Sequence, residues 1–273
     1  EIFLKDYSSD NWVMEKQETE RRGYQKIIYR AIDVSKFAED YLFRMGRKVI
    51  MLSATILDSE TFAKSLGLTN NDYESISIDS PFPPENRPIF QCNIGHMNSK
   101  NIENSLPKIK KAVEAILDEH ANQKGIIHCH TYRIARYLKF NIKSRKHSKR
   151  IIIHDSNNRD EMLNKHINSK APTVLLSPSM SEGVDLKGNL SRFQIICKIP
   201  YPYLGDAIIK KRMNKYKGWY SLQTAKNIVQ SCGRSIRSKE DTAVTYILDS
   251  DWERFYNNNK HVFPDDFKNA LVK

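Results

Sequence analysis

Apolar runs alternate with amphipathic stretches along this chain from about residue 48 onward. Each run is five to eight residues long and many are rich in β-branched side chains, which is typical of buried strands. The runs lie at 49–54, 74–78, 87–94, 125–130, 150–154, 173–177, 192–199 and 242–249. Strands that alternate with crossover helices predict an α/β fold, with a largely parallel sheet and flanking helices.

The polar stretches between these runs have helical periodicity. A long helix is predicted near 103–122, with one apolar face made of Leu106, Ile109, Val113, Ile116 and Leu117. A second is predicted at roughly 221–235, with Ser221 as its N-cap. Residues 1–47 are polar, with one amphipathic stretch at 34–43 and few strand signals, so we expect an accessory or connecting segment there. The main domain is predicted over 48–260, followed by a tail at 261–273.

Composition narrows the class of protein. None of the apolar runs approaches the roughly 18 residues needed to cross a bilayer, so no membrane partner is expected. The four cysteines are scattered singly, which argues for a reducing compartment and against a structural zinc site. The chain begins with Glu1 rather than Met, so an upstream segment is expected.

Positive charge is concentrated in two segments. The chain holds 44 Lys and Arg against 32 Asp and Glu, a net charge of +12. Residues 131–150 hold eight basic residues and no acid, and residues 206–240 hold nine basic residues and two acids. Such segments predict binding to a phosphate backbone or a nucleotide. The alternative is that these residues form solvated, lysine-rich helix faces.

Two local patterns follow predicted strands. In Ile126–Tyr132 a strand delivers hydroxyl and aromatic groups to its C-terminal end, where ligands gather in open α/β sheets. His128 and His130 alternate there as metal ligands would, but no third ligand is near in sequence. In Ser177–Gly188 the next strand breaks into a loop of small residues, acids and two glycines, in which Asp185 can accept hydrogen bonds from a sugar hydroxyl or an arginine.

The last pattern is Gln230-Ser231-Cys232-Gly233-Arg234-Ser235-Ile236-Arg237. If the helix continues through Gly233, the side chains of Gln230, Arg234 and Arg237 project from one helical face. Two guanidinium groups and an amide on one face suit a phosphoryl group, because the planar fork of Arg binds such oxygens in pairs. The alternative is an exposed basic helix end that interacts with the helix dipole.

The order of these motifs resembles the C-terminal half of the superfamily two helicases of the XPD and DinG type. The resemblance covers roughly residues 30–260 and rests on MLSATI, SPFPPENRPI, HCHTY, SEGVDLKG, KIPYPYLGD and QSCGRSIRS. It implies a RecA-like (P-loop NTPase-type) fold for 48–260, as the second motor domain of an ATP-dependent helicase. It further implies 5′ to 3′ movement on single-stranded DNA, a service in a repair or transcription complex, and a cytoplasmic, nucleoid-associated location in a prokaryote or a nuclear one in a eukaryote.

The resemblance assigns roles residue by residue. It gives the catalytic arginine-finger motif to Gln230, Arg234 and Arg237, which would reach ATP bound by the first motor domain. It gives nucleotide binding to Glu182, Gly183, Asp185 and Gly233, and DNA binding to Thr131, Tyr132, Arg133 and Ser179. No metal ligand is assigned.

Other parts of a helicase are missing from this sequence. No GxxxxGK[ST] loop is present, and the acidic box-like Asp118-Glu119-His120-Ala121 falls in the predicted long helix. ATP and Mg²⁺ are therefore expected to bind mainly to the first motor domain, and the isolated chain is expected to be inactive. An iron–sulfur cluster is possible in the complete protein but not in this chain. Two alternatives stay open: a non-catalytic nucleic-acid-binding or partner-docking domain with a helicase fold, and an RNA helicase.

Overall fold

The chain forms two compact units in the computed structural model, which describes residues 7–18, 23–155, 157–178 and 186–272. Unit 1 comprises residues 1–77 and 201–223, and unit 2 comprises residues 78–200 and 224–273. The boundary expected at residue 48 does not coincide with this division. Within the described part of the chain, no helix is long and apolar enough to cross a membrane.

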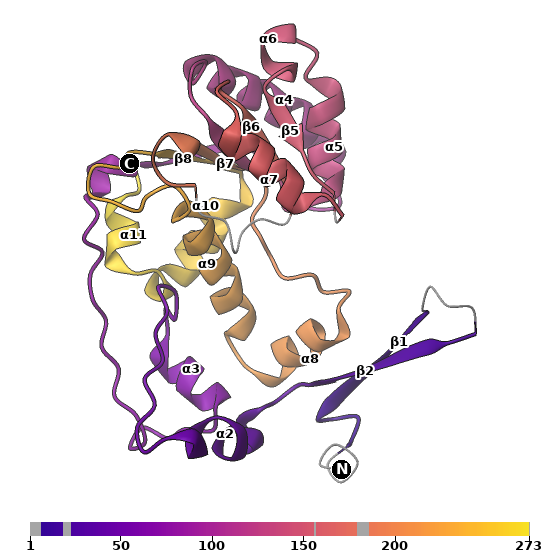
Figure 1. The fold of residues 1–273 in the computed structure, drawn as a ribbon. Coiled ribbons are helices and arrows are strands. Elements are labelled where there is room, and N and C mark those ends of the chain that lie inside the picture. The colour runs from indigo at the N-terminus through magenta and orange to yellow at the C-terminus, as the bar shows by residue number, and fades with distance from the viewer. Residues whose placement is uncertain (1–6, 19–22, 156, 179–185, 273) are drawn as a thin grey trace. The chain divides into compact units, whose positions relative to one another are not determined.

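Unit 2 is built on a six-stranded sheet in which every neighbouring pair is parallel (Figure 1). The strand order is β3 (Ile89–Gly95), β8 (Val244–Asp249), β7 (Phe193–Ile196), β4 (Gly125–His128), β6 (Val174–Ser177) and β5 (Ile151–Ile153). Five of the strands fall within a predicted apolar run, and β3 extends one residue beyond its run, to Gly95. The predicted α/β class with a parallel, RecA-like sheet is therefore confirmed.

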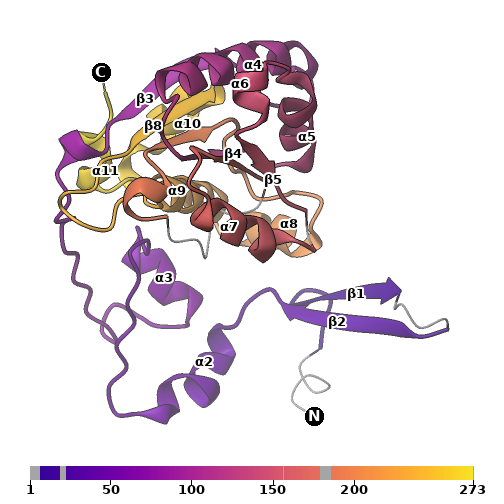
Figure 2. The same ribbon diagram turned by 45° about the horizontal axis from the view of Figure 1, so that its top comes forward.

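Helices cover both faces of this sheet (Figure 2). The amphipathic helices α4 (Ile102–Glu119) and α5 (Tyr132–Asn141) pack on one face, against alternate strand residues such as Ile127 and Ile195. On the other face α7 (Arg159–Asn168) packs against Ile126 and Leu175. The C-terminal part of α9 (Trp219–Cys232) lies on this second face as well.

The end of the chain packs into unit 2 rather than forming the expected tail. An aromatic cluster joins Trp252 and Phe255 of α10 (Asp251–Asn259) to Phe263, and to Phe267 of α11 (Asp265–Asn269). A bridge between Ile89 and Leu271 then adds the last residues to the edge of β3. The smaller elements of this unit are α6 (Arg145–Ser148), η2 (Pro84–Asn86), η3 (Gly188–Leu190) and η4 (Lys260–Val262).

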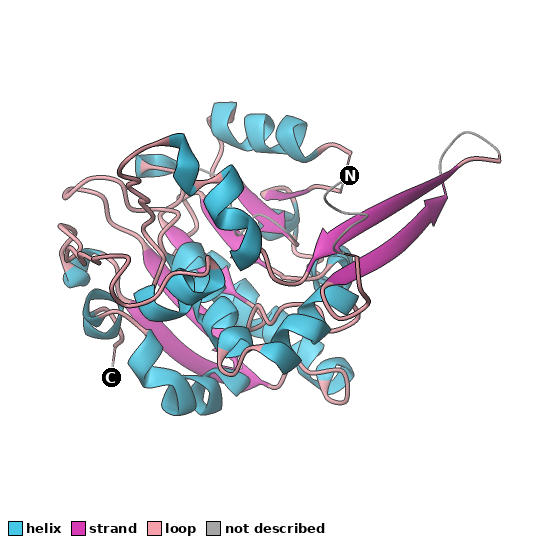
Figure 3. Cartoon of the chain, turned by 90° about the horizontal axis from the view of Figure 1, so that it is seen from below, coloured by secondary structure: helices cyan, strands magenta, loops and turns pink. Residues whose placement is uncertain are grey.

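Unit 1 contains an antiparallel pair of strands, β1 (Trp12–Glu18) and β2 (Gln25–Ala31), shown in magenta in Figure 3. The few strand signals before residue 48 did not predict this pair of strands. The reason is that Val13 is the one described residue of the two strands that is buried, so no clear apolar alternation marks them. The other elements are α2 (Ser35–Tyr41), η1 (Phe43–Met45), α3 (Ser59–Ser65) and α8 (Ala207–Lys215).

Two predicted strands of unit 1 do not form. Residues 49–54 and 74–77 have no regular structure, although both contain large apolar side chains. Ile50 is 83% exposed, Leu52 is 90% exposed and Ile76 is 87% exposed. An isolated strand cannot satisfy its backbone or bury its side chains, so a strand-like sequence forms no strand without neighbours.

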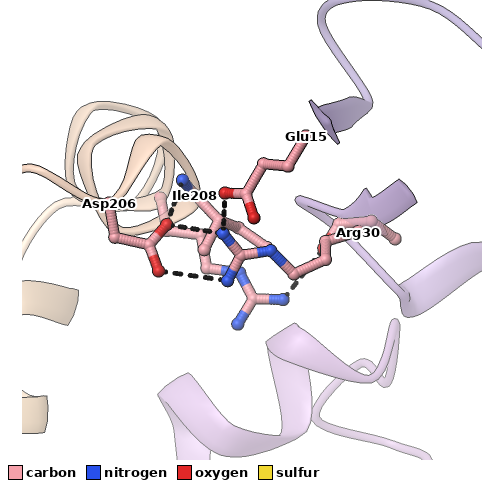
Figure 4. Close-up of polar contacts among 6 residues, drawn as sticks. Glu15, Arg30, Asp206 and Ile208 are labelled. Carbon is pink, nitrogen blue, oxygen red and sulfur yellow. Dashed lines mark hydrogen bonds and ion pairs between the residues drawn. The ribbon is translucent and has the colours of Figure 1, made fainter. Parts of the chain in front are cut away.

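Ion pairs hold α8 to the hairpin within unit 1 (Figure 4). Asp206 caps α8 by accepting a 2.9 Å hydrogen bond from the backbone N–H of Ile208. The same carboxylate accepts two hydrogen bonds from the Arg30 guanidinium, at 3.0 and 2.8 Å, and Glu15 pairs with that guanidinium as well. At the other end of the helix, Lys215 pairs with Asp33 at 2.9 Å.

We expect Arg30→Ala to loosen α8 and the hairpin, because the Glu15 and Asp206 carboxylates would then repel each other. For partly exposed ion pairs the loss is about 1 kcal/mol. Hydrogen exchange should show roughly fivefold faster exchange of protected amides in β1, β2 and α8, and unchanged exchange in β4 and β7. Arg30→Lys keeps the charge, so its exchange rates should lie between those of Arg30→Ala and the wild type. Identical exchange in Arg30→Ala and the wild type would contradict this role.

Candidate functional site

Polar side chains gather on one face of the sheet of unit 2. His128, Ser177, Gln194 and Thr245 lie on the neighbouring strands β4, β6, β7 and β8, and all four are buried. Their strand neighbours, such as Ile127 and Ile195, point into the apolar core on the opposite face. Burying polar groups is unfavourable unless they find partners. The polar side chains on this face therefore need hydrogen-bond partners, and the end of α9 provides one of them.

Gln194 determines where α9 ends. Its side-chain amide donates a 2.7 Å hydrogen bond to the carbonyl of Cys232, the last residue of the helix, and a 3.2 Å hydrogen bond to the Thr245 hydroxyl. The last carbonyls of a helix have no partner within it, so this bond satisfies one of them. The prediction that the helix continues through Gly233 is wrong. Arg234 and Arg237 extend from the loop after α9 rather than from its face.

The loop after α9 is held against the segment that precedes β7. The Leu186 N–H donates to the Arg234 carbonyl at 3.4 Å, a long bond. The hydroxyl of Ser235 lies 2.8 Å from that of Ser191, and both residues are buried. The structure thus places Leu186, near the end of the Ser177–Gly188 motif, next to Arg234 of the 230–237 motif.

Asp241 fixes the second half of this loop. Its carboxylate accepts hydrogen bonds from the backbone N–H groups of Arg237 and Ser238, both at 2.9 Å. Burial acts to raise the pKa of Asp241, but these two bonds, the nearby Arg192 charge and the Ser238 side chain together outweigh it, so the pKa is lowered. Asp241 therefore stays ionised at neutral pH and holds the Arg237 backbone in place, while the Arg237 side chain is exposed.

His128 lies under Arg234 as a neutral side chain. Burial, together with the nearby Arg234 charge, lowers the pKa of His128 to about 4, and the Gln194 side chain opposes this shift. The Nε2 atom of His128 and the Oε1 atom of Gln194 are both buried, and neither meets hydrogen-bond geometry with the described residues. A neutral imidazole adds no second positive charge beside the Arg234 guanidinium.

The predicted catalytic residues therefore come together at the end of α9. Gln230 is half-buried in the last turns of the helix, Gly233 follows directly, Arg234 is half-buried and Arg237 is exposed. Two guanidinium groups held by a fixed backbone can bind the oxygens of one phosphoryl group. Ser179, Glu182, Gly183 and Asp185 lie outside the described residues.

Three of the four predicted DNA-binding residues, Thr131, Tyr132 and Arg133, form a separate group at the start of α5. The Thr131 hydroxyl caps this helix by accepting a 3.3 Å hydrogen bond from the Ile134 N–H. Tyr132 is 37% exposed, and Arg133 pairs with Glu103. His130 adopts a left-handed backbone conformation with φ of 60°. Among the residues that the structure describes, no group of three or more His, Cys, Asp or Glu side chains could hold a metal ion.

Part of the positive charge in residues 131–150 is structural. Arg150 is buried and donates hydrogen bonds to four carbonyl oxygens, those of Leu117, His120, Gln123 and Pro172. Lys139 donates to the Ile151 carbonyl, and Lys146 pairs with Asp118. Arg150 and Lys139 bind backbone carbonyls of the fold and Lys146 pairs with an acid, so the charge of this segment that is left for a ligand is smaller than its composition suggests. The Asp118-Glu119-His120 sequence lies at the end of α4, as expected.

Sequence reasoning missed Gln194 and Asp241. Gln194 gives a usable signal, because it is a single amide inside the otherwise apolar run Phe193–Ile196. Such a residue in a buried strand needs a specific partner. Asp241 gives no comparable signal, since an acid in a polar loop is ordinary. His128 was considered as a metal ligand rather than as a neighbour of Arg234.

Comparison with known proteins identifies the family. The family described as Helicase C-terminal domain matches residues 113–270. The chain is 23% identical over 212 residues to the ATP-dependent DNA helicase YoaA of Escherichia coli (strain K12), covering 74% of this chain and 32% of that protein. The YoaA of Haemophilus influenzae matches with the same identity and coverage. The chain thus spans about a third of the length of these curated relatives.

Solved structures share the fold. An apo XPD structure has a TM-score of 0.65 at 15% identity, covering 86% of this chain and 51% of that one. An XPD helicase structure has a TM-score of 0.63 at 16% identity, covering 86% of this chain and 45% of that one. Saccharomyces cerevisiae Dbp5 bound to RNA and ADP BeF3 has a TM-score of 0.52 at 12% identity, covering 77% of this chain and 48% of that one.

The chain belongs to the helicase C-terminal domain family, since the family match covers more than half of it. Within that family it resembles the XPD and DinG type, as its motifs predicted.

We expect His128 to make folding stability depend on pH. Its pKa is about 4 in the folded protein and about 6.5 when unfolded, so its contribution is complete above pH 6.5 and is lost as the pH falls toward 4. The change is on the order of 3 kcal/mol. Urea unfolding between pH 7.5 and 4.5 should show a flatter pH dependence for His128→Asn than for the wild type. The exposed His261→Asn variant is the control, and equal slopes for His128→Asn and wild type would contradict the assignment.

Proposed function

We propose that this chain is the C-terminal motor domain of an ATP-dependent DNA helicase of the XPD and DinG type. Membership of the helicase C-terminal family and the likeness to ATP-dependent DNA helicases support this reading. The observation that carries it is the fixed pair of arginines after α9. Their backbone is held by hydrogen bonds that Leu186 donates and Asp241 accepts.

In this proposal Arg234 and Arg237 stabilise negative charge on the γ-phosphoryl group of ATP as it is transferred. Charge on the transferring group is spread over its oxygens, and preorganised cations at that position contribute most to catalysis. Gln230, on the last turns of α9, would orient the attacking water or the phosphate. Glu182, Gly183 and Asp185 precede Leu186, whose N–H contacts Arg234, so that loop would couple the nucleotide to the rest of the motor.

ATP and Mg²⁺ would bind mainly to a first RecA-like motor domain of the same protein. Unit 1 supports this partner, because Ile50, Leu52 and Ile76 are each more than 80% exposed in strand-like sequences. Large apolar side chains at this exposure are unfavourable in water, and a sheet supplied by another part of the protein would cover them. Any iron–sulfur cluster would belong to that part as well.

We further propose single-stranded DNA as the track, with 5′ to 3′ movement and a role in DNA repair. These assignments follow the resemblance to the XPD and DinG type. A repair or transcription complex would be the partner, and the location would be cytoplasmic and nucleoid-associated, or nuclear. Thr131, Tyr132, Arg133 and Ser179 would contact the strand without reading its sequence.

We expect Arg234→Ala to lower DNA-stimulated ATP hydrolysis by the protein at its native length. The kcat should fall by about 10³-fold, the effect of losing an arginine finger, with KM for ATP nearly unchanged. Arg237→Ala should also lower kcat. Arg254→Ala removes an arginine whose side chain is 70% exposed on α10, and should have wild-type kinetics.

The same assay separates the alternatives. If the wild type hydrolyses no ATP with any DNA strand and Arg234→Ala binds DNA as the wild type does, the chain is a nucleic-acid-binding or docking domain. Stimulation by RNA and not by DNA would point to an RNA helicase. Efficient hydrolysis by the isolated 273 residues would contradict the division of the site between two motor domains.

A further inference from the structure

Helix α5 has one exposed face with a distinct composition. Tyr132, Arg136 and Phe140 are spaced four residues apart, so they form a stripe along one side of the helix. Phe140 is 66% exposed and Tyr132 is 37% exposed. On the opposite side Ile134, Ala135 and Leu138 are fully buried in the core. The packing of α5 is therefore complete without the stripe, and the two aromatic rings have no role in the core.

The segment that carries this stripe has charge of one sign. Residues 131–150 contain no acid, and Arg133, Arg136, Lys143 and Arg145 are exposed. Arg136 and Lys143 have no ion pair or hydrogen-bonded side-chain partner within the described part of the chain. Arg133 pairs with Glu103 on α4, an exposed pair that contributes little. A positive surface that contains exposed aromatic rings fits a polyanion whose subunits carry flat rings.

The length of the stripe also fits such a ligand. Four residues of helix rise by about 6 Å, so the stripe from Tyr132 to Phe140 is about 12 Å long. Three or four stacked nucleotides occupy this length at about 3.4 Å each. The Thr131 cap fixes the start of the stripe shortly after the end of β4.

We propose that the stripe of Tyr132, Arg136 and Phe140 is a stacking surface for single-stranded DNA. Bases stack on the rings of Tyr132 and Phe140, and the Arg136 guanidinium binds a phosphate between them. Such contacts hold any sequence, because every base has a flat face. The inference rests on the proposed function in that this strand is the track of the motor, and it adds Arg136 and Phe140 to the contacts expected from the sequence.

The test is the binding of fluorescently labelled oligo(dT) to the protein at its native length, measured by anisotropy at several salt concentrations. Phe140→Ala and Tyr132→Ala should each weaken binding by at least about fivefold, and Phe140→Trp should restore it. Arg136→Ala should reduce the slope of log affinity against log salt by about 0.7, the value for one phosphate contact in a single strand. Tyr41→Ala, an exposed aromatic on α2, and Lys111→Ala, an exposed cation on α4, are the matched controls.

An abasic oligonucleotide separates stacking from charge. The wild type should bind it more weakly than oligo(dT), and Phe140→Ala should cause no further loss on it. If Phe140→Ala and Tyr132→Ala bind oligo(dT) like the wild type while DNA still stimulates ATP hydrolysis, the stacking surface is wrong and the proposed function stands. If the wild type binds no single-stranded DNA, both fail. If Phe140→Ala instead converts a dimer into a monomer in sedimentation without changing DNA affinity, the stripe is a protein interface and the proposal is overturned.

Discussion

The hydrogen bond from the Gln194 side chain to the Cys232 carbonyl determines the geometry on which the candidate site depends. It ends α9 above the sheet, and the chain then turns so that Arg234 and Arg237 leave from a loop. The backbone of that loop is held by the Leu186 N–H on one side and by the Asp241 carboxylate on the other. Long arginine side chains lose considerable entropy when they are ordered, so a fixed backbone is the part of their positioning that the fold can supply in advance.

The sheet of unit 2 has a different character on each face. One face is apolar and packs under α4 and α5, which gives the domain its core. The other carries His128, Ser177, Gln194 and Thr245, whose burial requires polar partners. The same polar face that is unfavourable for folding positions the end of α9. The polar groups that position the candidate site thus lie on one side of the sheet, beside the smaller apolar cluster under α7, and the neutral His128 adds no buried cation beside Arg234.

The sequence predicted the parts of the fold that depend on local patterns. Continuous apolar runs such as Val174–Ser177 became central strands, because both faces of a parallel strand are buried. The run at 49–54 has the same pattern but forms no strand, since strand formation depends on neighbouring strands and none pairs with it among the residues that the structure describes. The hairpin of β1 and β2 was missed for the opposite reason: its residues are mostly exposed, so burial left no pattern in them.

For the candidate site, the residue types Gln230, Arg234 and Arg237 could be selected from spacing, but their geometry could not. The end of α9 depends on Gln194, which lies 38 residues away in sequence. Long-range partners of this kind are set by tertiary packing, which a local pattern does not encode. The role of Arg150 also depends on long-range partners. Its hydrogen bonds to four carbonyl oxygens make it a structural residue, although its segment has the composition of a basic surface.

The most direct test of the central claim is a structure of the protein at its native length with single-stranded DNA, Mg²⁺ and ADP–aluminium fluoride, which mimics the transferring phosphoryl group. The account predicts a guanidinium nitrogen of Arg234 or Arg237 within about 3 Å of a fluoride, with the nucleotide held by another domain. A closed complex in which both arginines point away from the nucleotide would contradict it.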